Sequence, residues 1–199
     1  MMSFADLLGS NGWREDDVIT LHRLQNHQMQ TIVVPAGRAP ELVDEHLMGR
    51  DAWYSVCPLR KDFKAWVTEP DGRRRAVRGS EADVVGLRAL WTDLDVQPGK
   101  MPSYDAALDL ISVLSAHLGA RPSAQVASGH GIHPYWVIEE GLDWEPGDTA
   151  KIAEAKKMIG EWGRLVQQEA RRLGGAVDSV HDLARILRVP GTANMKGTS

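Results

Sequence analysis

The chain has 199 residues, a formal net charge of −4 and a single cysteine, Cys57. Its shares of hydrophobic residues (43%) and charged residues (25%) are those of a globular protein and exclude a disordered one. A lone cysteine excludes a disulfide framework and a cysteine-ligated zinc site within the chain, and it fits a reducing, cytoplasmic compartment. No apolar run is long enough to span a membrane, and residues 1–8 lack the basic and apolar regions of a signal peptide.

The first 85 residues predict an N-terminal α/β subdomain. Pro40 suits the first turn of a helix, and Asp71-Gly72 favours a hairpin turn because such a pair accepts positive φ. Polar residues at 26–28 separate the first two apolar runs. We therefore expect a helix at 39–48 and strands at 18–25, 31–34, 53–57, 63–68 and 74–77.

Residues 86–199 predict the order strand, helix, strand, strand, helix, strand, which is that of a ferredoxin-like or RNA-recognition-motif (RRM-like) sheet. The predicted fold class is therefore α+β, an RRM-like sheet joined to the N-terminal α/β subdomain in one compact unit. The expected elements are strands at 86–96, 125–127, 135–138 and from Val177, with helices at 103–118 and 146–173. For the first helix, the expected cap, stop and apolar stripe are Ser103, Gly119, and Leu108, Ile111, Leu114 and Leu118.

An acidic pair ends the strand predicted at 86–96. Residues i and i+2 of a strand point to the same side, so Asp93 and Asp95 are expected to lie together, roughly 7 Å apart along the strand. Two like charges at the end of a buried strand repel each other unless a cation lies between them, and carboxylates are preferred ligands of Mg²⁺. The pair predicts a divalent-metal site, although acids that simply face water at a strand end give the same pattern.

A glycine-containing turn follows at Ser128-Gly-His-Gly-Ile-His133. Gly129 and Gly131 allow backbone conformations that other residues avoid and let a ligand approach closely. Backbone N–H groups in such a turn can bind an anion, and Ser128 can donate its hydroxyl to a phosphate. The alternative is a plain hairpin with histidines at its rim. The spacing of His130 and His133 is not that of a zinc motif, and Ser128 lacks the Gly-x-Ser-x-Gly of a nucleophile.

A third polar stretch begins after Val177. Asp178 is the candidate for a third metal-binding carboxylate, with Asp182 as its rival. Arg185 and Arg188 are three residues apart and share a face if the segment is helical, where they could hold triphosphate oxygens. The alternative is an ordinary surface helix that stops at a Pro-Gly pair.

A basic segment surrounds the predicted hairpin. It is either a solvated hairpin with basic flanks or a nucleic-acid-binding surface made by Arg73, Arg74, Arg75 and Arg78. Tryptophans near the predicted strands are candidates for stacking on bases, although such residues more often lie in the core; they are Trp53, Trp66, Trp91 and Trp136.

In this order and spacing, the three polar stretches resemble motifs of the archaeo-eukaryotic primase superfamily, and above all of the primase-polymerase domains of bacteriophages, prophages and plasmids. Trp91-Thr-Asp-Leu-Asp-Val96 matches the first motif, Ser128-Gly-His-Gly-Ile-His-Pro-Tyr-Trp136 resembles the second, and Val177-Asp178 resembles the third. Arg188-Val-Pro-Gly-Thr-Ala-Asn194 is similar to an ending seen in phage-type members, and Arg78-Gly79 has a counterpart there. The resemblance covers residues 78–196. His130 departs from it, since some relatives carry a basic residue there that reaches phosphate.

The resemblance implies template-directed nucleotidyl transfer that makes and extends primers in phage or plasmid DNA replication. Two Mg²⁺ or Mn²⁺ ions would be the cofactors, held by the catalytic residues Asp93, Asp95 and Asp178. The nucleotide would be bound by Ser128, His130, His133, Arg185 and Arg188. The implied partners are a single-stranded DNA template, NTPs or dNTPs, and a helicase fused or associated beyond Ser199, in the cytoplasm of a bacterial host and not at a membrane.

Three other functions share parts of this pattern. A non-catalytic module that binds single-stranded nucleic acid would use the same sheet without needing the acids. A replication initiator would nick DNA through Tyr135, but it needs two histidines at alternate strand positions, which His130 and His133 are not. A two-metal nuclease would use the same carboxylates, and a primer-extension gel separates it from a polymerase.

Overall fold

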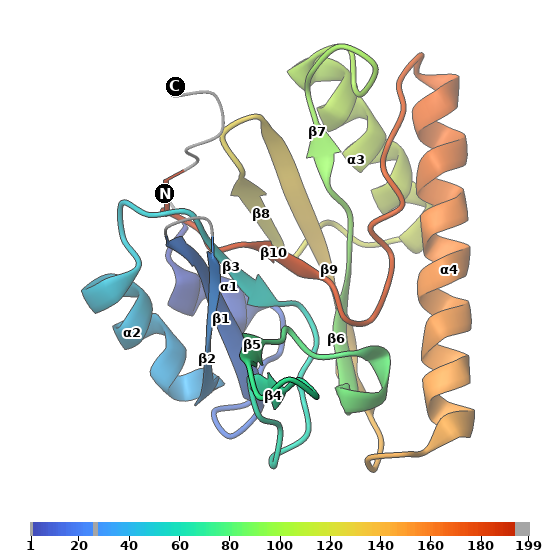
Figure 1. The fold of residues 1–199 in the computed structure, drawn as a ribbon. Coiled ribbons are helices and arrows are strands. Elements are labelled where there is room, and N and C mark those ends of the chain that lie inside the picture. The colour runs from blue at the N-terminus through green and yellow to red at the C-terminus, as the bar shows by residue number, and fades with distance from the viewer. Residues whose placement is uncertain (1, 26–27, 194–199) are drawn as a thin grey trace.

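The computed structural model describes residues 2–25 and 28–193. It combines helices with antiparallel sheets, which confirms the predicted α+β class (Figure 1). One sheet, here called the N-terminal sheet, has the strand order β10-β3-β1-β2. Its strands are β1 (Val18–Gln25), β2 (Gln28–Pro35), β3 (Ala52–Ser55) and β10 (Ile186–Arg188).

Two helices accompany the N-terminal sheet. They are α1 (Phe4–Ser10) and α2 (Ala39–His46), with a 3-10 turn at Ala36–Arg38. Phe4 of α1 meets Tyr54 of β3 edge to face, with ring centroids 5.1 Å apart, so α1 is anchored in the core beneath the sheet. The strands and the helix predicted within residues 18–57 are confirmed, while positions 26–27 of the predicted turn lie outside the described residues.

A second sheet, here called the central sheet, is built around β9 (Gly131–Asp143). β6 (Gly86–Trp91) and β7 (Leu94–Asp95) pair with one edge of β9, and β8 (Ala124–Ala127) pairs with the other, all antiparallel. Successive β9 residues face opposite ways. Tyr135 therefore joins the core shared with the N-terminal sheet, while Trp136 joins the core under α3 (Tyr104–Leu118) and α4 (Thr149–Arg172).

The strand predicted at 86–96 is interrupted at Thr92 and Asp93. The cause lies opposite, in β9, where Pro134 has no N–H to donate to the ladder. Only one bond crosses at this point, from the Thr92 N–H to the Pro134 carbonyl at 3.3 Å. Regular pairing resumes at Leu94, so the break gives Asp93 a backbone course distinct from that of an ideal strand.

The C-terminal segment corrects two predictions. Val177 starts no strand: residues 173–185 run as coil, in which the Val180 carbonyl accepts from the Trp91 indole N–H at 3.2 Å and from Arg185 Nε at 3.1 Å. Because side chains satisfy this carbonyl, the segment needs no sheet partner there. The residues around Arg188 form strand β10 rather than a helix, and β10 pairs with β3 of the N-terminal sheet.

Helix α3 follows its predicted limits. The Ser103 hydroxyl accepts from the Ala106 N–H at 3.1 Å, and Gly119 stops the helix with a φ of 66°. The predicted apolar stripe is only half right: Leu108 and Leu118 are exposed, because the buried face is shifted by about one position. That face comprises Ala107, Leu110, Ile111 and Leu114.

A buried cation joins the two sheets. Arg88 of β6 is 2% exposed, and its guanidinium bonds Asp17, which precedes β1, at 2.8 and 2.9 Å. Asp143 at the end of β9 lies 2.8 Å from the same guanidinium. This network fixes the central sheet against the start of the N-terminal sheet.

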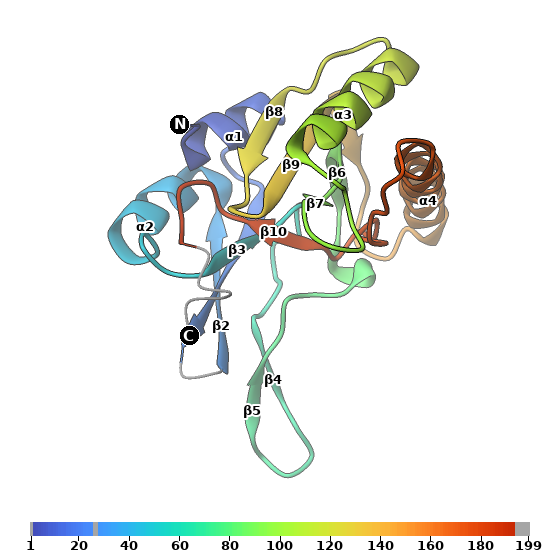
Figure 2. The same cartoon turned by 90° about the horizontal axis from the view of Figure 1, so that it is seen from above.

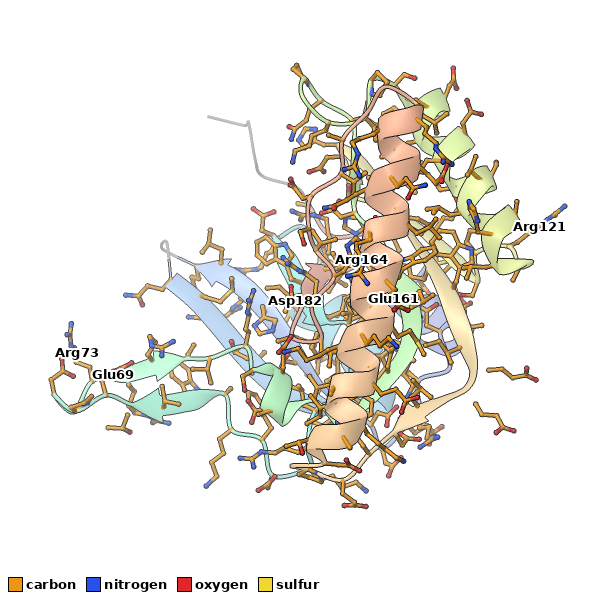
Figure 3. The ribbon with its side chains drawn as sticks, turned by 90° about the vertical axis from the view of Figure 1, so that its right-hand side faces the viewer. Glu69, Arg73, Arg121, Glu161, Arg164 and Asp182 are labelled. Atoms are coloured by element: carbon orange, nitrogen blue, oxygen red, sulfur yellow. The ribbon has the colours of Figure 1, made fainter. Side chains whose placement is uncertain are left out.

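A two-stranded hairpin projects away from both sheets, as Figure 2 shows. Its strands are β4 (Trp66–Thr68) and β5 (Arg74–Ala76), as the Asp-Gly turn predicts, and a 3-10 turn at Glu81–Asp83 leads on to β6. Glu69 and Arg73 lie at its tip (Figure 3). Within residues 2–25 and 28–193, no helix has the length and apolar character needed to cross a membrane.

Candidate functional site

A small pocket of about 170 Å³ lies where the two sheets meet. Residues from all three polar stretches line it, although they are far apart in the chain. They are Asp93 and Asp95 from the first, Ser128, His130 and His133 from the second, and Arg188 from the third. The structure therefore brings together six of the eight predicted catalytic and nucleotide-binding residues.

The antiparallel ladder of the central sheet positions the acids. Asp95 pairs with Gly131 across the ladder, and Leu94 pairs with Ile132. This register sets Asp93 opposite His133, and Asp93 Oδ1 lies 3.0 Å from His133 Nε2. His133 is 4% exposed, so its ring is held in place by packing. The acid and the imidazole therefore form one fixed pair in the wall of the pocket.

The glycine turn depends on backbone geometry at two positions. Gly129 has a φ of 93°, a region that favours glycine, and the turn closes with the Ser128 N–H donating to the Gly131 carbonyl at 3.0 Å. Gly131 has an ordinary φ, but a Cβ there would collide with the Leu94 carbonyl oxygen. Gly131 therefore lets β7 approach β9, and Gly129 turns the buried Ser128 toward the pocket.

Arg188 reaches the pocket from β10. Its Nη1 donates to Asp51 Oδ1 at 2.9 Å and to the Ala193 carbonyl, and its guanidinium lies 5.2 Å from the Trp53 ring centroid. The side chain is 6% exposed. Stacking and the Asp51 pair hold this cation in one orientation. Both of these hydrogen bonds are made by Nη1.

Two predicted residues do not line the pocket. The carboxylate of Asp178 forms an ion pair with Lys100 Nζ, in the loop that follows Asp95, and its side chain is 60% exposed. Arg185 Nη2 lies 2.5 Å from Asp182 Oδ2, and its other bonds go to backbone carbonyls of the coil. Because Arg185 stabilises the coil and Arg188 lies in a strand, the two do not share a helical face as predicted.

The acids suit a divalent cation in part. Asp93 and Asp95 offer oxygen ligands at one pocket, the chemistry that Mg²⁺ and Mn²⁺ prefer. Within the described part of the chain, however, no three histidine, cysteine or acidic side chains are placed to hold a metal together. The donor set of the pocket is therefore an acidic pair with an adjoining histidine. The predicted three-carboxylate cage is not formed while Asp178 is paired with Lys100.

The basic hairpin lies outside the pocket. Arg73 pairs with Asp71 at 2.6 Å, Arg75 pairs with Glu69 at 2.8 Å, and Arg74 stacks over Trp66 at 5.4 Å. Arg78 lines a separate hollow of about 850 Å³ between the hairpin and the N-terminal sheet. Two of these four arginines thus form ion pairs within the hairpin.

Aromatic residues divide between core and surface. Trp91 and Trp136 are core residues, which rules them out as stacking platforms, whereas Trp53 lines the pocket and Trp66 is 44% exposed. Tyr135 is 2% exposed, and burial, followed by the neighbouring Tyr54, raises its pKa. A nicking nucleophile must reach DNA, and Tyr135 does not meet that need in this fold.

The sequence alone missed three residues at or near the pocket: Asp51, Gln97 and Lys100. Asp51 orients Arg188 from a distant part of the chain, so no local pattern could reveal it. Gln97 and Lys100 lie in the loop after the acidic pair, where a search for polar residues next to the first motif would have found them.

Other hollows are larger, but they are weaker candidates for the functional site. One of about 420 Å³ is lined by charged residues that already pair with one another, such as Arg14 with Asp143 at 2.7 Å and Lys61 with Asp16 at 3.0 Å. We regard the 170 Å³ pocket as the candidate site because its acids, histidines and arginine converge from separate elements.

Comparisons with protein-family models, with curated proteins and with solved structures each found no match to the chain.

Proposed function

We propose that this protein is a primase-polymerase that transfers nucleotides to a growing strand on a single-stranded DNA template. The observation that carries the proposal is the convergence of all three polar stretches on one pocket, with Asp93, Asp95, His133 and Arg188 in its wall. Phosphoryl transfer needs acids that bind divalent cations and, beside them, an oriented arginine that binds phosphate. The resemblance of the three stretches to primase-polymerase motifs points to the same chemistry.

The residues of the pocket take separate roles. Asp93 and Asp95 hold divalent cations, which when bound supply positive charge for the reacting phosphate and lower the pKa of the attacking hydroxyl. His133 holds Asp93 in position across a 3.0 Å contact. Ser128 and His130 bind the nucleotide phosphates, and the Arg188 guanidinium neutralises their charge. Asp178 takes part as a third ligand only after it leaves Lys100, so the proposal rests on the other two acids.

The size of the pocket fits the reacting end of a nucleotide. About 170 Å³ is below the range of about 300–1,000 Å³ typical of whole-ligand sites, so it holds the phosphates and cations alone. A second hollow of about 440 Å³ shares Ser128 with it and is lined in part by Gly129 and Thr192. We assign the sugar and base of the incoming nucleotide to this second hollow.

The arrangement of the central sheet supports the RRM-like part of the proposal. Its strand order, β6/β7 then β9 then β8, with α3 and α4 packed on one face, corresponds to the first three strands of a ferredoxin-like sheet. The fourth strand, β10, pairs instead with β3. We propose an RRM-like core whose last strand, β10, pairs with the N-terminal sheet instead of the central sheet.

The test is incorporation of labelled nucleotides on a primed and an unprimed single-stranded template with Mg²⁺ or Mn²⁺. We expect the Asp93→Ala, Asp95→Ala double variant to lose about 100-fold or more, the usual scale for removing charge stabilisation from a transition state. The matched control is Asp105→Ala, Asp109→Ala, two exposed acids on α3 that should leave the rate unchanged. Equal activity of the parent and the first double variant would refute the proposal, and shortening of the primer would indicate a nuclease instead.

A further inference from the structure

Three hollows with shared lining residues, here called the groove, extend from the candidate pocket to the β4–β5 hairpin. The 850 Å³ hollow and the 170 Å³ pocket share Ile186 of β10 in their walls. Beyond it, a third hollow of about 790 Å³ shares Met29 and Trp66 with the 850 Å³ hollow. The hairpin stands out from the body of the protein beside this path (Figure 2). Each of the three hollows thus shares lining residues with the next.

Trp66 stands in this groove as an open aromatic surface. It is 44% exposed and is the one exposed tryptophan of the seven, all of which lie in the described residues. Trp66 lines both larger hollows, whereas Arg74, 5.4 Å from the ring centroid, lines only the 790 Å³ hollow. The stacked guanidinium holds the ring in place.

The cations of the groove divide into neutralised and available ones. Arg60 lies 3.3 Å from Asp83 and 3.4 Å from Asp62, and Arg75 pairs with Glu69. Lys64 and Arg78 are exposed, and neither forms an ion pair with any residue that the structure describes. Two available cations and an exposed aromatic ring along one path provide what a flexible polyanion with unstacked bases needs.

We propose that this groove holds the single-stranded template, with one base stacked on Trp66 and the backbone phosphates at Lys64 and Arg78. The inference rests on the proposed function, because the groove shares Ile186 with the pocket where nucleotides would be joined. Duplex DNA is the poorer occupant, since its bases are stacked on one another and offer no free face to an indole. The template strand then runs from the pocket over Ile186 toward the hairpin.

The groove is tested by anisotropy of a labelled 20-nucleotide single strand, measured on the full chain without nucleotide or divalent cation. We expect Trp66→Ala to weaken binding about tenfold and Trp66→Phe to restore most of it, because a phenyl ring still stacks. Lys64→Ala and Arg78→Ala should each lower the slope of log affinity against log salt by about 0.7. Binding should also quench the tryptophan emission of the parent, and Trp66→Phe should remove most of that quenching.

Two exposed residues that line none of the three hollows serve as matched controls. Arg121, exposed after α3 and opposite the hairpin in Figure 3, controls for the cations, and exposed Tyr104 controls for the aromatic ring. Both alanine variants should bind as the parent does. The groove is refuted if Trp66→Ala binds as tightly as the parent, or if a duplex of the same length binds as well as the single strand. Because these readouts need no incorporation, failure of the groove and failure of the polymerase proposal are separate results.

Discussion

The two sheets of this protein contribute to the pocket by different routes. The central sheet supplies Asp95 and His133 from strands of one antiparallel ladder, and Asp93 from the break between β6 and β7. The N-terminal sheet supplies Arg188, which is brought there because β10 pairs with β3. One wall of the pocket thus depends on the register of neighbouring strands, and the other depends on long-range pairing. Disturbing the strand register should displace the acids and His133. Loosening the contact between the two sheets should displace Arg188.

The largest expected effect comes from the buried cation between the sheets. Arg88→Met should lower the free energy of unfolding by about 3 to 5 kcal/mol, because Asp17 is then left buried without its cation. Urea denaturation measures the change. Arg164→Met is the control: its guanidinium is 72% exposed and lies 3.9 Å from Glu161 on the outer face of α4 (Figure 3), so a change within about 0.5 kcal/mol is expected. Equal effects of the two substitutions would show that Arg88 does not anchor the sheets.

The register of the central sheet is tested at Gly131. Gly131→Ala should lower the free energy of unfolding by about 3 kcal/mol, because the new Cβ meets the backbone of Leu94 and nothing nearby can move without parting β7 from β9. Nucleotide incorporation should fall as well, because Asp95 pairs with Gly131. In Gly160→Ala, on α4, the nearest atom lies 3.8 Å from the new Cβ, and the helix should gain about 0.5 to 1 kcal/mol. If Gly131→Ala left the free energy of unfolding unchanged, the close approach of β7 to β9 would not require glycine at this position.

The pH dependence of stability tests a buried histidine in each half. Burial, followed by Arg78, lowers the pKa of His22 to about 4, and burial, followed by Arg185, lowers the pKa of His181 to about 4. The unfolded chain binds these protons near pH 6.5, so the free energy of unfolding should fall as the pH falls from about 6.5 to 4. Between pH 7 and 5 we expect a loss of about 2 kcal/mol from His22 and less from the more exposed His181. Urea denaturation at both pH values measures the loss, and His22→Asn should make it smaller; equal stability of the parent at pH 7 and pH 5 would contradict these pKa values.

The smallest expected effect concerns Asp178. Asp178→Asn should reduce incorporation less than tenfold, while Asp93→Asn should reduce it about 100-fold, because only the latter acid lines the pocket. Single-turnover rates with saturating Mn²⁺ compare the two. Equal losses would mean that Asp178 leaves Lys100 and joins the acidic pair during incorporation.

Much of the fold follows from local signals in the chain. The Asp-Gly turn predicts the hairpin, Ser103 and Gly119 mark the ends of α3, and the spacing of Asp93 and Asp95 predicts that they meet one surface. Each of these depends on a few consecutive residues, whose backbone preferences do not need the rest of the protein. The sequence places Arg188 in a helix, whereas it lies in strand β10 and lines the pocket from there; its role as a site residue stays a prediction.

Tertiary structure alone decided the rest. Pro134 interrupts the opposite strand only because β9 lies beside it, Asp51 meets Arg188 across the chain, and Asp178 pairs with Lys100 instead of the other acids. The periodicity of a sequence reports local geometry and which face is buried. Which strand pairs with which, and which charge neutralises which, depends on the free energy of contacts between distant segments, and these exist only once the chain has folded.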